Sequence, residues 1–326
     1  MDNVILLADK NSCAWGFAEK IRDYISEECE PICLESVSIQ QFRNKELDIY
    51  IPANVRKKEV YFIHDASKNP QDWLTQLVLI EDALKRASVG EICLVLPNLP
   101  YERKDWKDRP HVPISARKIA KIISEDADRM ITMDLHSPQI QGFYDIPVDA
   151  LEGFLDVVDY LIRDRSFNLE NLVVVAADVG GAKRTRNFAE KLERILRESK
   201  LNIEIPMAII DKRRVRGEVD EMRLIGEVKD KDVIIYEDMI DSGGTLKSAA
   251  ELLRREGAKK LVAYGTHGIF TEDADLKLSN LYDRLMVSNT IPYTPRGKVE
   301  VIDVSHTFAK AIYRAQKGLS ISNLFK

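Results

Sequence analysis

Short runs of apolar residues rich in valine and isoleucine recur along the chain, and longer segments with apolar residues at every third or fourth position separate them. The clearest runs cover residues 4–8, 60–63, 92–96, 130–133, 172–176, 207–210, 233–236 and 261–264. A run that is apolar at every position is typical of a strand buried on both faces, and helices between such strands are typical of parallel sheets. The pattern predicts an α/β fold with mostly parallel sheets flanked by helices.

The two halves of the chain repeat one pattern. The segment 58–65, Lys-Glu-Val-Tyr-Phe-Ile-His-Asp, resembles the segment 231–238, Lys-Asp-Val-Ile-Ile-Tyr-Glu-Asp, which begins 173 residues later. Each segment is followed by an amphipathic helix and then by a further apolar run. The apolar helix positions are Leu77, Ile80 and Leu84 in the first half and Leu246, Ala249 and Leu253 in the second. The repeat predicts two similar domains, with a boundary between residues 150 and 171, which we set at 1–155 and 156–326.

Length, composition and charge narrow the class of protein. The chain has 326 residues, which corresponds to about two domains of typical size. With 45% hydrophobic and 31% charged residues, it is neither disordered nor collagen-like. No apolar run approaches the roughly 20 residues of a membrane-spanning helix, and the first residues lack the basic start of a secretion signal. We therefore expect a cytoplasmic protein without membrane attachment, and the net charge of −5 argues against binding to nucleic acid through bulk charge.

The segment 233–245 carries the strongest functional signal. An apolar strand ends in two acids, and the turn before the next helix combines acidic, hydroxyl and glycine residues; these are Glu237, Asp238, Asp241, Ser242, Gly243, Gly244 and Thr245. Glycines let backbone N–H groups approach an anion, and a helix N-terminus favours negative charge. Carboxylates at the carboxyl end of a parallel strand can bind sugar hydroxyls. The alternative is a plain acidic strand end with a tight turn. We favour a sugar-phosphate site, one per chain, because the first half lacks such a turn.

Further charged groups follow other predicted strands. Asp134 and His136 follow the strand 130–133, and carboxylate oxygens with one imidazole suit a partly hydrated Mg²⁺ that carries nucleotide phosphates. Asp178 precedes Gly180-Gly181, a second candidate anion turn, and the helix after it carries Lys183, Arg184 and Arg186, which could equally form a solvated face. Lys212 and Arg214 follow the strand 207–210. Beside a phosphate site, such cations can neutralise charge during phosphoryl transfer.

Together these motifs resemble the ribose-phosphate diphosphokinase family, also called phosphoribosyl diphosphate (PRPP) synthetases, whose domains have the fold of type I phosphoribosyltransferases. The resemblance runs nearly end to end. It is carried most strongly by Asp-Leu-His-Ser-Pro-Gln-Ile-Gln-Gly-Phe-Tyr-Asp-Ile-Pro-Val-Asp at 134–149 and Glu-Asp-Met-Ile-Asp-Ser-Gly-Gly-Thr at 237–245. It implies an enzyme that transfers the diphosphoryl group of MgATP to the C1 hydroxyl of ribose 5-phosphate, with PRPP and AMP as products and Mg²⁺ as cofactor.

The resemblance also implies roles for individual residues. It assigns catalysis to Lys212, Arg214 and His136, and metal binding to Asp134, His136, Asp145, Asp149 and Asp178. It assigns ribose 5-phosphate binding to Asp178, Glu237, Asp238, Asp241, Ser242, Gly243, Gly244 and Thr245. It assigns ATP binding to Phe42, Asn44, Glu46, Arg103, Lys104, Lys107 and Asp108. Because the family's loop at Phe42 reaches the site of a neighbouring subunit, we expect a homodimer or homohexamer with shared ATP sites.

The chain departs from the family pattern in the stretch that contacts ATP. Lys104 stands where glutamine is usual, and Trp106 stands where a basic residue is usual. Trp106 could stack on a base or pack against the protein, and we favour packing. These departures motivate one alternative, a non-catalytic subunit that keeps the fold. A second alternative, a phosphoribosyltransferase that consumes PRPP, would not require a duplicated chain with a second metal-linked segment.

Overall fold

Each of the predicted apolar runs forms a strand of a mostly parallel sheet. The structure is a computed structural model that describes residues 1, 3–163, 168–198, 200–215 and 218–325, without the side chains of 213–221. The chain divides into two units. The first unit comprises Met1–Gly153, Asn289–Pro292 and Asp303–Lys326, and the second comprises Phe154–Ser288 and Tyr293–Ile302. The predicted α/β class is confirmed.

The first unit contains a seven-stranded sheet in the order β3-β2-β1-β4-β5-β6-β7. The pair β2 and β3 is antiparallel, and the other neighbours pair in parallel. Its elements are β1 (Val4–Asp9), α1 (Ala14–Glu28), β2 (Cys33–Gln41), β3 (Leu47–Tyr50), β4 (Glu59–Ile63), α2 (Pro70–Arg86), β5 (Glu91–Leu96), α3 (Ser115–Ile123), β6 (Arg129–Met133), η1 (Pro138–Phe143), β7 (Val148–Leu151), α8 (Ser305–Gln316) and η4 (Ile321–Phe325).

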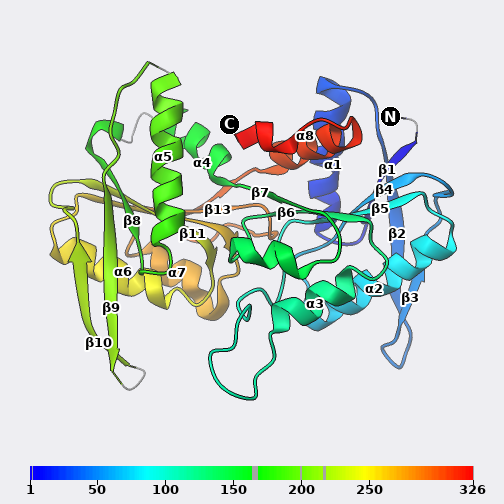
Figure 1. Ribbon diagram of the computed structural model, residues 1–326, viewed down its shortest axis with the longest axis horizontal. Coiled ribbons are helices and arrows are strands. Elements are labelled where there is room, and N and C mark those ends of the chain that lie inside the picture. The colour runs from blue at the N-terminus through cyan, green and yellow to red at the C-terminus, as the bar shows by residue number, and fades with distance from the viewer. Residues whose placement is uncertain (2, 164–167, 199, 216–217, 326) are drawn as a thin grey trace. The chain divides into compact units, whose positions relative to one another are not determined.

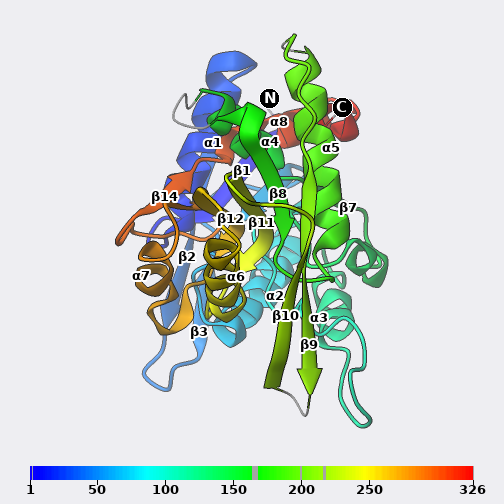
Figure 2. The ribbon, with the colours of Figure 1, turned by 90° about the vertical axis from the view of Figure 1, so that its left-hand side faces the viewer.

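The second unit repeats this arrangement, with a seven-stranded sheet in the order β10-β9-β8-β11-β12-β13-β14. Its first two strands form a long antiparallel pair (Figure 2). Its elements are α4 (Phe154–Arg163), η2 (Leu169–Asn171), β8 (Leu172–Ala176), α5 (Ala182–Glu198), β9 (Met207–Val215), β10 (Glu218–Ile225), β11 (Asp232–Ile240), α6 (Gly244–Arg255), β12 (Lys260–Gly268), η3 (Thr271–Asp273), α7 (Ala274–Ser279), β13 (Arg284–Ser288) and β14 (Val299–Ile302). The two sheets have the same strand order, so the internal repeat is a repeat of the fold.

The helices bury the faces that their sequence periodicity predicts. The side chain of Asn69 caps α2 by accepting a hydrogen bond from the Gln71 N–H at 3.0 Å, which satisfies one of the N–H groups that a helix start leaves unpaired. Leu77, Ile80 and Leu84 of this helix are fully buried against the sheet. Among the described residues, no helix is long and apolar enough to cross a membrane.

The C-terminal segment packs on the first unit, which differs from the predicted continuous ranges 1–155 and 156–326. In Figure 1, α8 lies beside α1. The rings of Phe17 and Phe308 meet edge to face with their centroids 5.4 Å apart, and Ile312 is fully buried in the same core. The apolar face of α8 therefore finds its partner far back in the sequence, which the internal repeat could not indicate.

A buried carboxyl group in α2 should make the stability of the protein depend on pH. Glu81 is 1% exposed, and burial, followed by the charges of Asp126 and Glu125, raises its pKa from 4.5 to about 9. The folded state therefore keeps a proton that the unfolded state releases above pH 4.5. The free energy of unfolding should fall as pH rises from about 5 to 9, by up to about 1.4 kcal/mol per pH unit.

Replacement of Glu81 by glutamine should remove this part of the pH dependence, because the amide does not titrate. Urea unfolding of both proteins at pH 6 and pH 8 measures the difference. We expect wild type to lose stability relative to Glu81→Gln between the two pH values. Equal changes in both proteins would show that Glu81 does not titrate as its burial predicts.

Candidate active site

The turn between β11 and α6 has the backbone geometry of an anion site. Gly243 has a φ of +74°, and a Cβ at this position would lie 3.0 Å from Leu278 Cδ1, so a side chain is excluded by both conformation and space. Gly244 begins α6, and a Cβ there would meet no protein atom within 4 Å. The first hydrogen bond of α6 runs from the Lys247 N–H to the Gly243 carbonyl at 2.8 Å. The N–H groups before Lys247 lie in the first turn, where the helix provides no carbonyl acceptors for them. Such groups bind phosphate well.

A strained segment supports this turn. The hydroxyl of Thr271 donates to Asp241 Oδ1 at 2.7 Å. Phe270, Glu272 and Asp273 have φ values of 51°, 56° and 57°. This left-handed conformation is costly for residues with a side chain and persists where the surroundings enforce it. The hydrogen bond from Thr271 connects this segment, which follows β12, to the turn.

An arginine links the two acids at the end of β11. Arg184 Nη1 lies 2.9 Å from Glu237 Oε2 and 3.1 Å from Asp238 Oδ1. Arg184 lies in the first turn of α5, the helix that follows β8, and β8 is a neighbour of β11 in the sheet. The side chains of the arginine, the glutamate and the aspartate are 25%, 14% and 6% exposed. The three residues form a partly buried charged cluster, and Arg184 is not part of a solvated face.

The charges around Glu237 act in opposite directions. Burial raises its pKa to about 7, and the carboxylates of Asp238 and Asp178 add to the rise. Arg184 and Lys212 lower it. Asp178 follows β8, Lys212 lies in β9 and Glu237 lies in β11, so these residues of separate sequence motifs come from three neighbouring parallel strands.

Asp178 follows β8 in a tight turn that leads into α5. Its Oδ1 accepts a hydrogen bond from the Gly181 N–H at 3.0 Å, and a Cβ on Gly180 would lie 3.2 Å from the same oxygen. Lys212 is half-buried and lies within β9, which extends beyond the predicted run 207–210 to Val215. The side chain of Arg214, its predicted catalytic companion, lies outside the described side chains.

Sequence reasoning missed the part that Arg184 plays. The sequence offered one signal for it: the first turn of α5 contains the cation Arg184 and no acidic residue that could balance its charge. A cation near a helix N-terminus opposes the helix dipole, and an anionic partner elsewhere in the fold compensates for it. The partners, Glu237 and Asp238, lie more than 50 residues later, so only the folded structure identifies them.

In the first unit, Asp134 and His136 follow β6 as predicted. Asp134 has a φ of +42°, and its Oδ2 accepts a hydrogen bond from the Gly153 N–H at 3.2 Å. The His136 N–H donates to Glu102 Oε2 at 3.1 Å, and Glu102 is buried. Backbone contacts thus fix both residues at the carboxyl end of a parallel strand, where ligands of α/β sheets bind.

The other predicted metal ligands have different surroundings. Asp149 forms an ion pair with Arg129, the first residue of β6, and the exposed Asp145 donates its N–H to Ser124 Oγ at 3.1 Å. Within the described ranges, no three His, Cys, Asp or Glu side chains are grouped so that they could hold a metal ion. The metal role of Asp145, Asp149 and Asp178 stays a prediction.

The residues predicted to bind ATP lie in two exposed loops. Residues 42–46 form the connection between β2 and β3, in which the Phe42 N–H donates to the Glu46 carbonyl at 2.8 Å. Asn44 Oδ1 accepts from the Glu46 N–H at 3.2 Å, and Phe42 is exposed. Phe42 follows directly after β2 with its ring exposed, and its contact with ATP stays a prediction.

The second loop contains Arg103, Lys104, Lys107 and Asp108, all exposed. Lys104 Nζ and Asp108 Oδ2 form an ion pair at 2.7 Å. The expectation that Trp106 packs against the protein is wrong, since its side chain is 65% exposed. A short loop rich in charged residues provides no apolar surface to cover it, so the ring is free to stack on a ligand.

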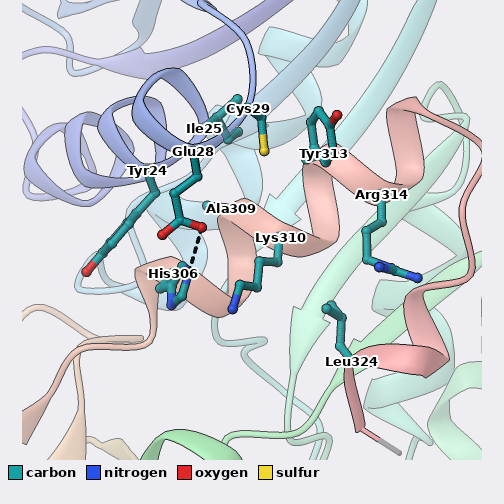
Figure 3. A pocket seen from close by; sticks show the side chains of 10 residues that line it. All are labelled: Tyr24, Ile25, Glu28, Cys29, His306, Ala309, Lys310, Tyr313, Arg314 and Leu324. Atoms are coloured by element: carbon teal, nitrogen blue, oxygen red, sulfur yellow. Dashed lines mark hydrogen bonds and ion pairs between the residues drawn. The ribbon is translucent and has the colours of Figure 1, made fainter.

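A groove of about 330 Å³ lies elsewhere in the first unit, between α1 and α8 (Figure 3). Tyr24 and His306 stack at its edge with ring centroids 4.6 Å apart, and His306 Nε2 lies 3.4 Å from Glu28 Oε2. Lys310 and Arg314 also line it. None of the predicted catalytic, metal or substrate residues lines this groove.

Comparisons with known proteins agree over most of the chain. Residues 8–126 match the N-terminal domain of ribose phosphate pyrophosphokinase, and residues 198–326 match the phosphoribosyl synthetase-associated domain. The chain is 40% identical to a ribose-phosphate pyrophosphokinase of Clostridium acetobutylicum, covering 95% of this chain and 94% of the relative. It is 39% identical to ribose-phosphate pyrophosphokinase 2 of Saccharomyces cerevisiae, covering 95% and 94%.

Among solved structures, the phosphoribosylpyrophosphate synthetase of Mycobacterium smegmatis superposes with a TM-score of 0.83 at 30% identity, covering 97% of this chain and 99% of that one. Sequence and fold thus lead to the same relatives over nearly their full lengths. The chain belongs to the ribose-phosphate pyrophosphokinase family.

Proposed function

We propose that this chain transfers the diphosphoryl group of MgATP to ribose 5-phosphate. The C1 hydroxyl oxygen of the sugar attacks the β-phosphorus of ATP, and the bond from that phosphorus to the oxygen bridging the α-phosphorus breaks. AMP leaves with the bridging oxygen, the hydroxyl proton passes to solvent, and PRPP is the product. The observation that carries the proposal is the ion-paired acids Glu237 and Asp238 in β11, the strand that leads into the Gly243-Gly244 turn, in a chain of this family.

The turn and the acids of the second unit suit ribose 5-phosphate. The N–H groups at the start of α6, with the hydroxyls of Ser242 and Thr245, donate to the 5-phosphate. Glu237 and Asp238 accept hydrogen bonds from sugar hydroxyls. Binding both ends of the sugar fixes the C1 hydroxyl in one orientation, which lowers the entropic part of the barrier to transfer.

Cations of β9 act on the phosphates of ATP in this proposal. Negative charge builds on phosphate oxygens as the diphosphoryl group is transferred, and a fixed cation in a partly buried site stabilises that charge more than water does. Lys212 is half-buried and acts electrostatically on Glu237, which supports a position beside the sugar. We assign Arg214 the same role on the basis of the family resemblance.

Two donors of the first unit suit Mg²⁺. Asp134 and His136 offer one carboxylate and one imidazole at the end of β6, and Mg²⁺ characteristically keeps several waters and takes only one or two protein ligands together with substrate phosphates. When bound, Mg²⁺ supplies positive charge to the phosphates of ATP. Asp134 and His136 would hold the ion, and the metal role of Asp178 rests on the family resemblance alone.

The exposed hairpin tip supports a shared ATP site. Phe42, Asn44 and Glu46 project from the connection between β2 and β3, and we propose that they contact ATP bound to a neighbouring subunit of a homodimer or homohexamer. The loop of Arg103, Lys104, Lys107 and Asp108 contacts ATP from the same chain, with Trp106 available to stack on the base. A cytoplasmic location remains part of the proposal.

Identification of the products tests the proposed reaction. Purified protein is incubated with Mg²⁺, ATP and ribose 5-phosphate, and the products are followed by ³¹P nuclear magnetic resonance. We expect PRPP and AMP in equal amounts, and no AMP without ribose 5-phosphate. Formation of ADP would mean transfer of a single phosphoryl group. An absence of turnover with any nucleoside triphosphate would favour the non-catalytic subunit.

The contact between Thr271 and Asp241 should support sugar-phosphate binding. Thr271→Val keeps the shape of the side chain but removes its hydroxyl, so the turn loses one hydrogen bond of about 1 kcal/mol. We expect the KM for ribose 5-phosphate to rise roughly three- to tenfold, while the KM for ATP stays constant. Thr271→Ser, which keeps the hydroxyl, is the control and should resemble wild type. An unchanged KM in the valine variant would show that the turn does not need this support.

A further inference from the structure

Arg184 makes two ion pairs through a single nitrogen. Its Nη1 lies 2.9 Å from Glu237 Oε2 and 3.1 Å from Asp238 Oδ1. The two acids are consecutive residues of β11, and side chains of consecutive strand residues ordinarily point to opposite faces of a sheet. A cation that contacts both carboxylates therefore fixes the position of each relative to the other.

The position of Arg184 in α5 is electrostatically unfavourable for the helix. Arg184 lies in the first turn of α5, a turn without acidic residues. A positive charge there opposes the helix dipole. The neighbouring Arg186, in the same region of the helix, is exposed, whereas Arg184 is directed toward the acids. The ion pairs with the two acids offset this unfavourable position.

The acids need such a partner. Asp178 also contributes negative charge at Glu237, and three carboxylates in a partly buried site repel one another. Glu237 has one more rotatable bond than an aspartate, so its carboxylate has more conformations from which to choose unless a contact restricts it. Arg184 supplies both the opposing charge and the restriction.

We propose that Arg184 is a positioning residue for ribose 5-phosphate, which holds Glu237 and Asp238 ready to accept hydrogen bonds from the sugar hydroxyls. This inference rests on the proposed function. It assigns Arg184 no contact with the reacting phosphorus. Its loss should therefore weaken sugar binding more than it slows turnover at saturating substrate.

Direct binding and steady-state kinetics of four variants test the proposal. Arg184→Met and Arg184→Gln remove the charge, and Arg184→Lys keeps it. Arg186→Met removes an exposed arginine from the same helix and is the matched control. Titration calorimetry with ribose 5-phosphate gives the Kd without requiring turnover, and thermal melting verifies that each variant is folded.

We expect the Kd and the KM for ribose 5-phosphate to rise at least about tenfold in Arg184→Met and Arg184→Gln, as for loss of a hydrogen bond to a charged group. The KM for ATP should stay constant, and kcat should fall by less than about threefold. Arg184→Lys should recover most of the affinity, because one nitrogen makes both contacts. Arg186→Met should bind like wild type.

A folded Arg184→Met or Arg184→Gln variant that binds ribose 5-phosphate as tightly as wild type would overturn the proposal, and so would an equal loss in Arg186→Met. If Arg184→Met does not fold, the affinity of Arg184→Gln for ribose 5-phosphate tests the proposal. Failure of the proposed function gives a different result. In that case wild type would bind ribose 5-phosphate without making PRPP, while the calorimetric series would still determine the role of Arg184.

Discussion

Replacement of Lys212 by alanine should lower kcat by at least about a hundredfold while leaving the Kd for ribose 5-phosphate within about threefold of wild type. Lys212 is a half-buried residue within β9 whose charge acts on Glu237. In the proposed reaction it stabilises charge that develops only during transfer, so its removal acts on the transition state more than on bound substrate. Single-turnover kinetics and titration calorimetry separate the two effects.

The control for this variant is Lys259→Ala, which removes an exposed lysine from the connection between α6 and β12. We expect normal turnover and normal binding from it. If Lys212→Ala instead loses affinity for ribose 5-phosphate and keeps its kcat, Lys212 would be a binding residue and the role given to β9 would be incorrect.

Two neighbouring glycines should respond differently to the same substitution. A Cβ at Gly244 meets no protein atom within 4 Å, and Ala is a better helix residue than Gly at the start of α6. Gly244→Ala should therefore be at least as stable as wild type. If the phosphate lies against this turn, the added methyl group occupies space that the ligand needs, and the affinity for ribose 5-phosphate should fall at least about tenfold.

Gly243→Ala should instead lose stability. Its φ of +74° is unfavourable for alanine, and the new Cβ would lie 3.0 Å from Leu278 Cδ1. We expect a loss of about 1–2 kcal/mol in the free energy of unfolding. Thermal melting and calorimetry of the two variants separate packing from ligand contact. Wild-type affinity in a folded Gly244→Ala variant would contradict the assignment of the turn to the phosphate.

The sequence predicted those parts of the fold whose signals are local. The central strands contain long apolar runs because both faces are buried, as in Val4–Ala8 of β1 and Ile92–Leu96 of β5. Edge strands gave weaker signals. β3, for example, alternates between half-buried and exposed residues, and it was not among the apolar runs. The C-terminal helix α8 packs on α1 because their apolar faces match, and no local pattern identifies such a distant partner.

In the candidate site, too, local features were predictable from the sequence, whereas contacts between distant residues were not. The Gly243-Gly244 turn was predictable because glycine, hydroxyl and acidic residues lie next to one another in the sequence. The pairing of Arg184 with Glu237 and Asp238, and that of Arg129 with Asp149, joins residues from different elements, so only the folded chain shows them. Trp106 is exposed because its loop offers no apolar surface to cover the ring. The local sequence alone does not tell whether another part of the chain provides such a surface.

The central claim is that the C1 oxygen of the sugar attacks the β-phosphorus of ATP. Ribose 5-phosphate labelled with ¹⁸O at the C1 hydroxyl, mixed rapidly with the protein, Mg²⁺ and unlabelled ATP, tests it directly. The account predicts PRPP with ¹⁸O in the bridge between C1 and phosphorus and AMP without label, read by mass spectrometry and by the isotope shift in ³¹P resonance. Label in AMP, or labelled sugar carrying a single new phosphoryl group together with ADP, would contradict it.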